Sequence, residues 1–560
     1  MEENQKQTQQ SGCVVKLNRK PDREVLLQKA DRMLLWVLLL LTALFVVFYE
    51  GYRCGSFSYY FGGDTEAYYI YFNHTGVIMP LYPIFFHVLQ LVFGRELYLT
   101  AAAIIQMVFL ILTIVGTVQC LRREFSLGPP ATLVIWGCCM LPFAILLPED
   151  PIGHTLMTES FTYPLFYLFV CSVLRGLRRG RRYFAAALGI AFASALVRSQ
   201  MMFLFVVCGL FYVYAVIWRW DTVPASAQGM AEQEAGGENT GRECAGSSPL
   251  PFPLTENMNT ERERAENSHS HRAFRWRKAA EVMLFGALTL FVMRSVTWLH
   301  AAYERFFFDA PYVAYSDQTL VQHMLYLSDE EDARLFQDPA LREIFAETYR
   351  RSVRLGANHR FEEKGLEAWR KIVADCGSCS YTLGDVIEDY YVRHGGWPAE
   401  DGIAQEQLKA QISHALARPL LRVHFTDKLR ETLRLMPSGF VSTMLFHKES
   451  VYGLIHLATA LLYLSGFAGA AILSARDTSG EGERSDCEKG EQKKFGGQDA
   501  GPVTVSEMVM LTFLLSIVNV TACNLIHFGL QRYLAYTLGF NWAALFLLLR
   551  EFRSRAGGKN

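Results

Sequence analysis

The chain has 560 residues, of which 51% are hydrophobic, and its formal net charge at pH 7 is −1. This length exceeds one ordinary soluble domain, and the apolar residues fall in long blocks between polar stretches. No stripe of Lys and Arg interleaved with aromatic residues is present, so we expect no nucleic-acid partner. Several of the twelve cysteines lie inside apolar blocks, where a thiol is usually a small hydrophobe, so the cysteines predict no disulfide framework.

The first apolar block, 33–49, is long enough to cross a hydrocarbon core of about 30 Å. It follows about thirty polar residues, and Glu50 and Arg53 come after it in place of the small residues of a cleavage site. We therefore expect a retained membrane anchor and not a secretory signal peptide.

The apolar blocks together predict an all-α integral membrane protein with about ten transmembrane helices. The expected spans are 33–50, 97–119, 129–147, 160–174, 183–197, 200–218, 279–297, 451–474, 505–526 and 532–549. The segment 80–93 is apolar but too short to span, so we expect a re-entrant or interfacial helix there.

Basic residues predict the orientation, because Lys and Arg are enriched on the cytoplasmic side. They cluster before the first span, after the second and fourth, before the seventh and after the last. The clusters comprise Lys16, Arg19, Lys20, Arg23, Lys29 and Arg32; Arg122 and Arg123; Arg175, Arg178, Arg179, Arg181 and Arg182; Arg275, Arg277 and Lys278; and Arg550, Arg553 and Arg555. With a cytoplasmic N-terminus, ten spans put every cluster inside, and the C-terminus is cytoplasmic as well.

Two stretches, 221–272 and 475–504, lack the apolar content to fold alone and are expected to be disordered. By contrast, 299–445 has helical patterning and is expected to be a folded insert on the outer face. The predicted order is a cytoplasmic tail (1–32), a transmembrane core with outer loops (33–220), a cytoplasmic linker (221–278), a transmembrane helix (279–298), an extracytoplasmic helical domain (299–445), another transmembrane helix (446–474), a second linker (475–504) and a C-terminal transmembrane pair with a short tail (505–560).

Ionisable and aromatic side chains collect in the predicted outer loops. They are Asp64, Glu66, Tyr68, Glu149, Asp150, His154, Glu159, Arg198, His527, Gln531 and Arg532. Charges at the hydrocarbon edge cost several kcal/mol unless they are paired or hydrated, which makes them functional candidates. Carboxylates act as general bases or hold a divalent metal, and arginines bind phosphate bidentately. Together they suit a phosphorylated lipid that enters from the outer leaflet.

Each residue also has a structural interpretation. Asp64 is a suitable helix N-cap, and Glu149 and Asp150 stand beside prolines, as in a turn. Glu159 could cap a span or offset its dipole, and Arg198, like Arg532, could reach toward lipid headgroups. In the insert, Cys376 and Cys379 could form a local disulfide or be redox or metal ligands, although no second CxxC lies nearby.

The order of short motifs resembles the GT-C superfamily of membrane glycosyltransferases, in particular the branch of protein O-mannosyltransferases and lipid A aminoarabinose transferases. These motifs are GGDTEAYY, MPLYPIFFHVLQLVFGRELY, MTES opening a helix that ends at RGLRRGRR, ALGIAFASALVRS, and QRYLAYTLGFNWAALFLL. The resemblance covers about residues 30–220 and, more weakly, 505–550. It departs from the family at Met79-Pro80, where a double proline is usual. It also leaves open which of Asp64 and Glu66 is the acidic residue that acts in catalysis.

The resemblance implies an inverting transfer of a sugar from a polyprenyl-phosphate donor to an extracytoplasmic acceptor, which could be a protein, a glycan or a lipid, at the plasma membrane. Asp64 or Glu66 would be the general base, assisted by Glu149 or Asp150. Arg198, Gln531 and Arg532 would bind the donor phosphate, and Glu159 would orient an arginine or the acceptor. Tyr68, Tyr82, His154 and His527 would line the substrate groove. No cofactor is certain, and a requirement for Mg or Mn is left open.

Two other classes of function are compatible with the same residues. A transporter or flippase of a lipid-linked sugar would also use outer arginines, but it usually shows mid-span charges and internal repeats, and few of the former and none of the latter are evident. A non-enzymatic membrane protein would bind a partner through the insert and would not require Asp64.

Overall fold

A computed structural model describes part of the chain, and all regular elements of that part are helices. The described residues are 20–49, 51–52, 55, 59, 79–146, 152, 154–220, 256–309, 315–365, 367–445, 451–480, 502–526 and 531–557.

Seven of the described helices are long and apolar enough to cross a membrane. They are Lys29–Tyr49, Leu81–Glu124, Glu159–Arg179, Ser199–Arg219, Trp276–Phe308, Tyr452–Ala475 and Val505–Ile526. The predicted class of a multi-pass, all-α membrane protein is therefore confirmed. The other three predicted spans fall on α6 (Pro129–Leu146), α8 (Arg181–Val197) and α19 (Leu538–Gly557), which are shorter or carry more charge.

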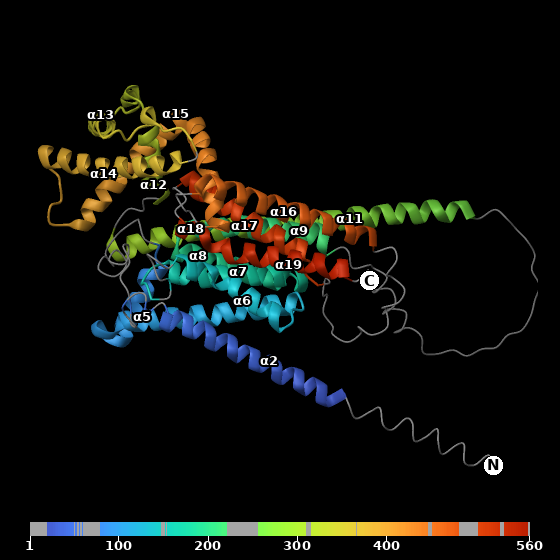
Figure 1. The fold of residues 1–560 in the computed structure, drawn as a ribbon. Helices are drawn as coiled ribbons and strands as arrows, with labels where there is room; N and C mark the ends of the chain where they lie inside the picture. The colour runs from blue at the N-terminus through green and yellow to red at the C-terminus, as the bar shows by residue number, and fades with distance from the viewer. Residues whose placement is uncertain are drawn as a thin grey trace, which may run out of the picture.

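The apolar helices lie side by side in one elongated bundle (Figure 1). Its elements include α2 (Lys20–Ala43) with the π-helical turn η1 (Leu44–Tyr49), α5 (Leu81–Glu124), α7 (Glu159–Arg179), α9 (Phe203–Tyr214) with η3 (Ala215–Arg219), α11 (Glu256–Phe308), α16 (Tyr452–Gly480) and α17 (Val505–Ile526). α2 begins and α19 ends at the same end of the bundle, and the helical insert lies beyond the opposite end.

The helix α5 is broken at Gly94, whose φ of 75° and ψ of 173° are not helical. A side chain at such a φ would be strained, so glycine is the residue that permits this break. The break separates the short apolar segment 80–93 from the span after it, as the sequence predicts. Leu91, Val92 and Leu97 beside the break are exposed, as expected for side chains in contact with lipid.

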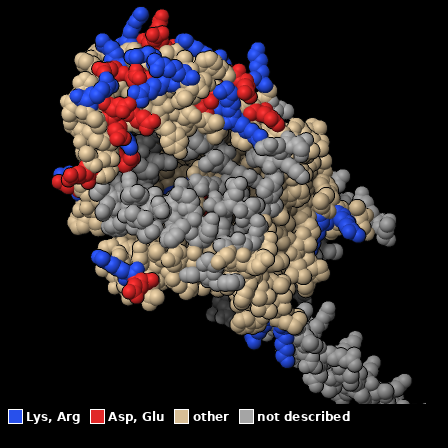
Figure 2. Space-filling view, turned by 60° about the vertical axis from the view of Figure 1, so that its left-hand side comes forward, with Lys and Arg blue, Asp and Glu red and all other residues tan. Residues whose placement is uncertain are grey.

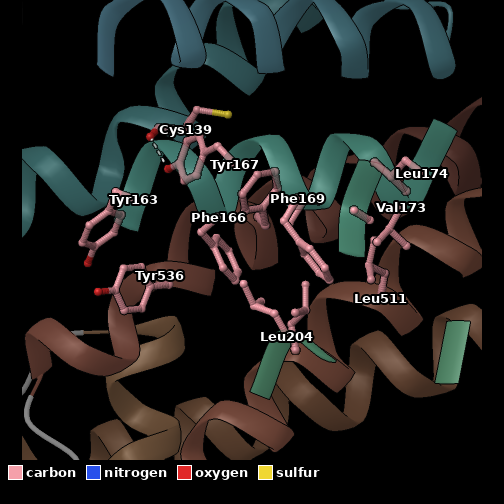
Figure 3. Close-up of a cluster of buried hydrophobic side chains, with 14 of the residues drawn as sticks. Cys139, Tyr163, Phe166, Tyr167, Phe169, Val173, Leu174, Leu204, Leu511 and Tyr536 are labelled. Atoms are coloured by element: carbon pink, nitrogen blue, oxygen red, sulfur yellow. Dashed lines mark hydrogen bonds between the residues drawn. The ribbon is translucent and has the colours of Figure 1, made fainter. Parts of the chain in front are cut away.

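Aromatic side chains of α7 fill the centre of the bundle (Figure 3). The ring of Tyr163 lies 4.3 Å from that of Tyr536, and Tyr167 lies 4.7 Å from Phe540. The Tyr167 hydroxyl donates to the carbonyl oxygen of Cys139, at 2.8 Å. Because lipid tails are as apolar as these side chains, close packing and hydrogen bonds hold such helices together, and α7 supplies both.

The insert has a hydrophobic core of its own. It consists of α12 (Tyr315–Leu327), η4 (Glu330–Leu335), α13 (Pro339–Arg354), η5 (His359–Phe361), α14 (Ala368–His394) and α15 (Gly402–Met444). Charged side chains gather over this end of the molecule in Figure 2, and few are drawn on the described surface of the bundle around the grey residues. The last turns of α15 join the insert to the bundle, where Trp542 and Asn541 of α19 donate to the carbonyl oxygens of Met444 and Thr443.

The structure differs from the sequence prediction in both linkers. Residues 475–480 of the second linker belong to α16, and the residues of the linker 221–278 from Glu256 onward belong to α11. The segment 256–278 contains no Gly or Pro and is rich in Glu and Arg, which are good helix formers. A low apolar content predicts that a segment has no core of its own, but it does not prevent a membrane helix from extending into it. The residues 221–255 lie outside the described part.

Gly539 permits a close approach of α19 to α6, since a Cβ there would lie 2.5 Å from the carbonyl oxygen of Cys138. We expect Gly539→Ala to lower the free energy of unfolding by about 1–3 kcal/mol, because backbone cannot rotate away from the added methyl group. Gly137→Ala on α6 is the matched control, since its Cβ meets no atom within 4 Å. Thermal unfolding of the purified proteins in detergent measures the effect of each substitution on stability. Equal melting temperatures for the two variants would contradict the prediction.

Candidate functional site

The structure describes the side chains of four predicted site residues: Tyr82, His154, Glu159 and Arg198. The predictions for Asp64, Glu66, Tyr68, Glu149, Asp150 and His527 fall outside the described residues. Gln531 and Arg532 are in the short helix α18 (Gln531–Leu534), and only their backbone is described.

Glu159 and Arg198 form an ion pair at the end of the bundle that faces the insert. An oxygen of Glu159 lies 2.6 Å from Nη1 of Arg198, and the same nitrogen donates to the hydroxyl of Thr158 at 2.9 Å. Glu159 begins α7, where its negative charge also suits the helix dipole. Arg198 follows α8 in extended backbone, so its side chain is directed by the turn between α8 and η2 (Ser199–Met202).

A third segment completes this arrangement. The guanidinium carbon of Arg198 lies 4.2 Å from the ring centre of Tyr533 in α18, which is a cation–π contact. The arginine therefore lies between a carboxylate and an aromatic ring. Both its side chain and that of Glu159 are largely buried, with exposed fractions of 15% and 4%. A charge in this setting is stabilised by its partners and not by water.

Gln200, which no sequence pattern points to as a site residue, positions α18 against α17. Its side-chain nitrogen lies 2.7 Å from the carbonyl oxygen of Tyr533, 3.0 Å from Oδ1 of Asn519 and 3.0 Å from Sγ of Cys523. Asn519 donates to the same carbonyl oxygen of Tyr533. The available signal was a glutamine two residues after Arg198, in a turn between two apolar segments.

The other two described residues pack near the beginning of α7 or against η1. Tyr82 accepts a hydrogen bond from Gln106 at 2.5 Å, and its ring lies 5.7 Å from that of Phe161, two residues after Glu159. The ring of His154 is fully buried, and its Nε2 donates to the carbonyl oxygen of Val46 at 2.9 Å. Tyr82 therefore lies near the ion pair, whereas His154 joins the α7 entry loop to η1.

The CxxC pair of the insert is not a disulfide. Cys376 and Cys379 are both free and buried on α14, and Sγ of Cys379 lies 3.2 Å from the carbonyl oxygen of Ala357. Burial raises the pKa of the Cys379 thiol to about 12. Cys376 instead contacts His323 and Glu431. Burial would raise the pKa of Glu431, but the neighbouring His323 and Lys428 outweigh it and lower this pKa to about 2.

Comparisons with known proteins identify no relative of this chain: no family model, no curated protein and no solved structure matches it.

Glu159→Gln is expected to destabilise the protein by about 3 kcal/mol, because Arg198 keeps its charge in a buried site without the carboxylate. The double variant with Arg198→Gln should lose less than the sum of the single variants, since the two residues share one interaction. Equilibrium unfolding in mixed micelles measures the free energies.

Glu281→Gln is the matched control, because the Arg181 side chain that pairs with Glu281 is 61% exposed. Its expected cost is below about 1 kcal/mol. Equal losses for Glu159→Gln and Glu281→Gln, or strict additivity in the double variant, would show that the Arg198 pair does not stabilise the fold.

Proposed function

We propose that this protein is a membrane glycosyltransferase of the GT-C type, which moves a sugar from a polyprenyl-phosphate donor to an extracytoplasmic acceptor at the plasma membrane. The observation that supports this proposal is the oriented Arg198. It is held by Glu159 and Tyr533 at the end of the bundle facing the insert. A fixed guanidinium at a membrane boundary is suited to bind the phosphate of a lipid.

The proposed chemistry is a single inverting displacement. The acceptor hydroxyl oxygen forms a bond to the anomeric carbon of the sugar, and the bond from that carbon to the phosphate oxygen breaks. The leaving phosphate keeps the electron pair, and the acceptor proton passes to a carboxylate, for which Asp64 is the proposed base. Glu66, Glu149 and Asp150 remain the candidates for positioning the acceptor or a divalent metal.

Arg198 would stabilise the charge that develops on the phosphate as the bond to the sugar breaks. Gln531 and Arg532 are proposed to bind the same phosphate, since they adjoin Tyr533, whose ring contacts Arg198. Glu159 orients Arg198 in this proposal. Tyr82, whose ring packs against those of Phe86 and Phe161, is the proposed groove residue from α5. Tyr68, His154 and His527 are proposed groove residues from the sequence pattern.

We also propose ten spans with both termini in the cytoplasm and the insert outside. The ion pairs at the end of the bundle remote from the insert support this orientation, because their arginines belong to the predicted inside clusters. These pairs are Arg122–Asp31, Arg178–Glu124 and Arg181–Glu281.

The orientation is tested with a membrane-impermeant maleimide on intact cells. Tyr381→Cys in the insert, where the native side chain is 80% exposed, should be labelled directly. Ser554→Cys near the end of α19, which is also exposed, should be labelled only after the membrane is permeabilised. The unsubstituted chain provides the background from the native cysteines. Labelling of Ser554→Cys in intact cells would contradict a cytoplasmic C-terminus.

Sugar transfer is tested with the purified protein in liposomes and a panel of polyprenyl-phosphate sugars. Wild type should release the carrier phosphate, and Asp64→Asn should lower the rate by about 10²-fold or more, because a general base contributes at least that much. Asp385→Asn, the same change at an exposed position of α14, should leave the rate unchanged. A donor that binds but is never consumed, with Asp64→Asn behaving as wild type, would exclude the enzyme and favour a flippase or a binding protein.

A further inference from the structure

Three potential metal ligands meet inside the insert, near its junction with the bundle. They are His323 of α12, Cys376 of α14 and Glu431 of α15, separated by 53 and 55 residues in the sequence. Their side chains are almost completely buried, with exposed fractions of 0%, 0% and 3–4%. Each residue directs one ligand atom to the same point, since these atoms all lie within 4.8 Å of one another.

The distances between the ligand atoms match those around a tetrahedral zinc ion. Sγ of Cys376 lies 3.7 Å from Nδ1 of His323 and 3.8 Å from Oε1 of Glu431, and Nδ1 of His323 lies 3.1 Å from that oxygen. Zinc bonds of about 2.0–2.1 Å to nitrogen or oxygen and about 2.3 Å to sulfur place tetrahedral ligands roughly 3.3–3.6 Å apart. Shifts of a few tenths of an ångström would bring all three atoms onto one ion.

We infer that His323, Cys376 and Glu431 form a zinc-binding site, with a water molecule as the fourth ligand. The ligand set favours zinc over magnesium or manganese, because thiolate and imidazole are poor ligands for those hard cations. As the metal binds, the Cys376 thiol loses its proton to solvent, and so does Nδ1 of His323, which faces the Glu431 carboxylate at 3.0–3.1 Å. The thiolate and the carboxylate then balance the two positive charges of the ion.

The second oxygen of Glu431 already has the partner that a ligating carboxylate needs. Lys428 Nζ donates to Oε2 at 2.8 Å, which leaves Oε1 directed toward Cys376. Outer partners of this kind orient ligands in metal sites. The charge of Lys428 is stabilised separately, because it also donates to the carbonyl oxygen of Asn524 in the last turn of α17, at 3.2 Å. The C-terminus of a helix carries partial negative charge and favours a cation there.

The position of the cluster places the ion between the helices of the insert and the end of α17. Lys428 and Thr432 of α15 both donate to the carbonyl oxygen of Asn524, so the site lies directly against the end of α17. One residue earlier, Cys523 contacts Gln200, which binds the backbone of Tyr533. Zinc would therefore hold three helices of the insert together at the point where the insert meets the Arg198 region.

The test uses the full chain in detergent, stripped with a chelator and then given zinc alone. Elemental analysis after dialysis should find about one zinc ion per chain, and the melting temperature should rise on zinc addition. Cobalt in place of zinc should produce a thiolate-to-cobalt charge-transfer band and the visible bands of a tetrahedral site. None of these readouts measures sugar transfer, so the zinc site can be confirmed or excluded whether or not the protein is a glycosyltransferase.

Cys376→Ser should abolish the charge-transfer band and lower zinc retention at least tenfold. Cys379→Ser is the matched control, because this second thiol lies three residues further along α14 and contacts Ala357 instead, and it should behave as wild type. If Cys376→Ser fails to fold, wild type still decides the question. A wild-type chain that retains no zinc, or that gives cobalt spectra without a thiolate band, would show that the cluster is only a buried hydrogen-bonded ion pair.

Discussion

The ion pair between Arg198 and Glu159 is the interaction on which the described part of the candidate site depends. It joins the beginning of α7 to the turn after α8, and the cation–π contact with Tyr533 adds α18. Leaving either charge unpaired in a largely buried position would cost several kcal/mol. The three segments are therefore fixed relative to one another, although Glu159 and Tyr533 are separated by most of the chain.

The last turns of α17 connect this pair to the insert. Asn519 and Cys523 contact Gln200, and the carbonyl oxygen of Asn524 accepts hydrogen bonds from Lys428 and Thr432 of α15. Carbonyl groups at a helix C-terminus have no partner within the helix, so the insert supplies one. Because both sets of contacts lie within six residues of α17, a displacement of α15 would act on the same turn that positions Tyr533.

The sequence predicts the membrane class and several elements because apolar blocks and glycine breaks are local signals. The break at Gly94 and the helix beginning at Glu159 follow from such signals. The cost of a charge at the hydrocarbon edge also makes Glu159 and Arg198 candidate site residues. It does not predict that they pair with each other, since no local pattern joins residues 39 positions apart. Gln200 and Glu431 were missed for the same reason: their partners come from other helices. The helical start of α11 was missed because low hydrophobicity predicts the absence of a core, not the absence of a helix.

An arginine suits the position of Arg198 for a geometric reason as well as for its charge. Its planar guanidinium lies against the Tyr533 ring, and Nη1 contacts both Glu159 and Thr158. A guanidinium carries five N–H donors spread over three nitrogens, so a single arginine can donate to a carboxylate and to a phosphate at the same time. A lysine has one nitrogen, which would have to serve the carboxylate and the phosphate together. In the proposed enzyme, Glu159 therefore orients the cation and need not leave it when the donor binds.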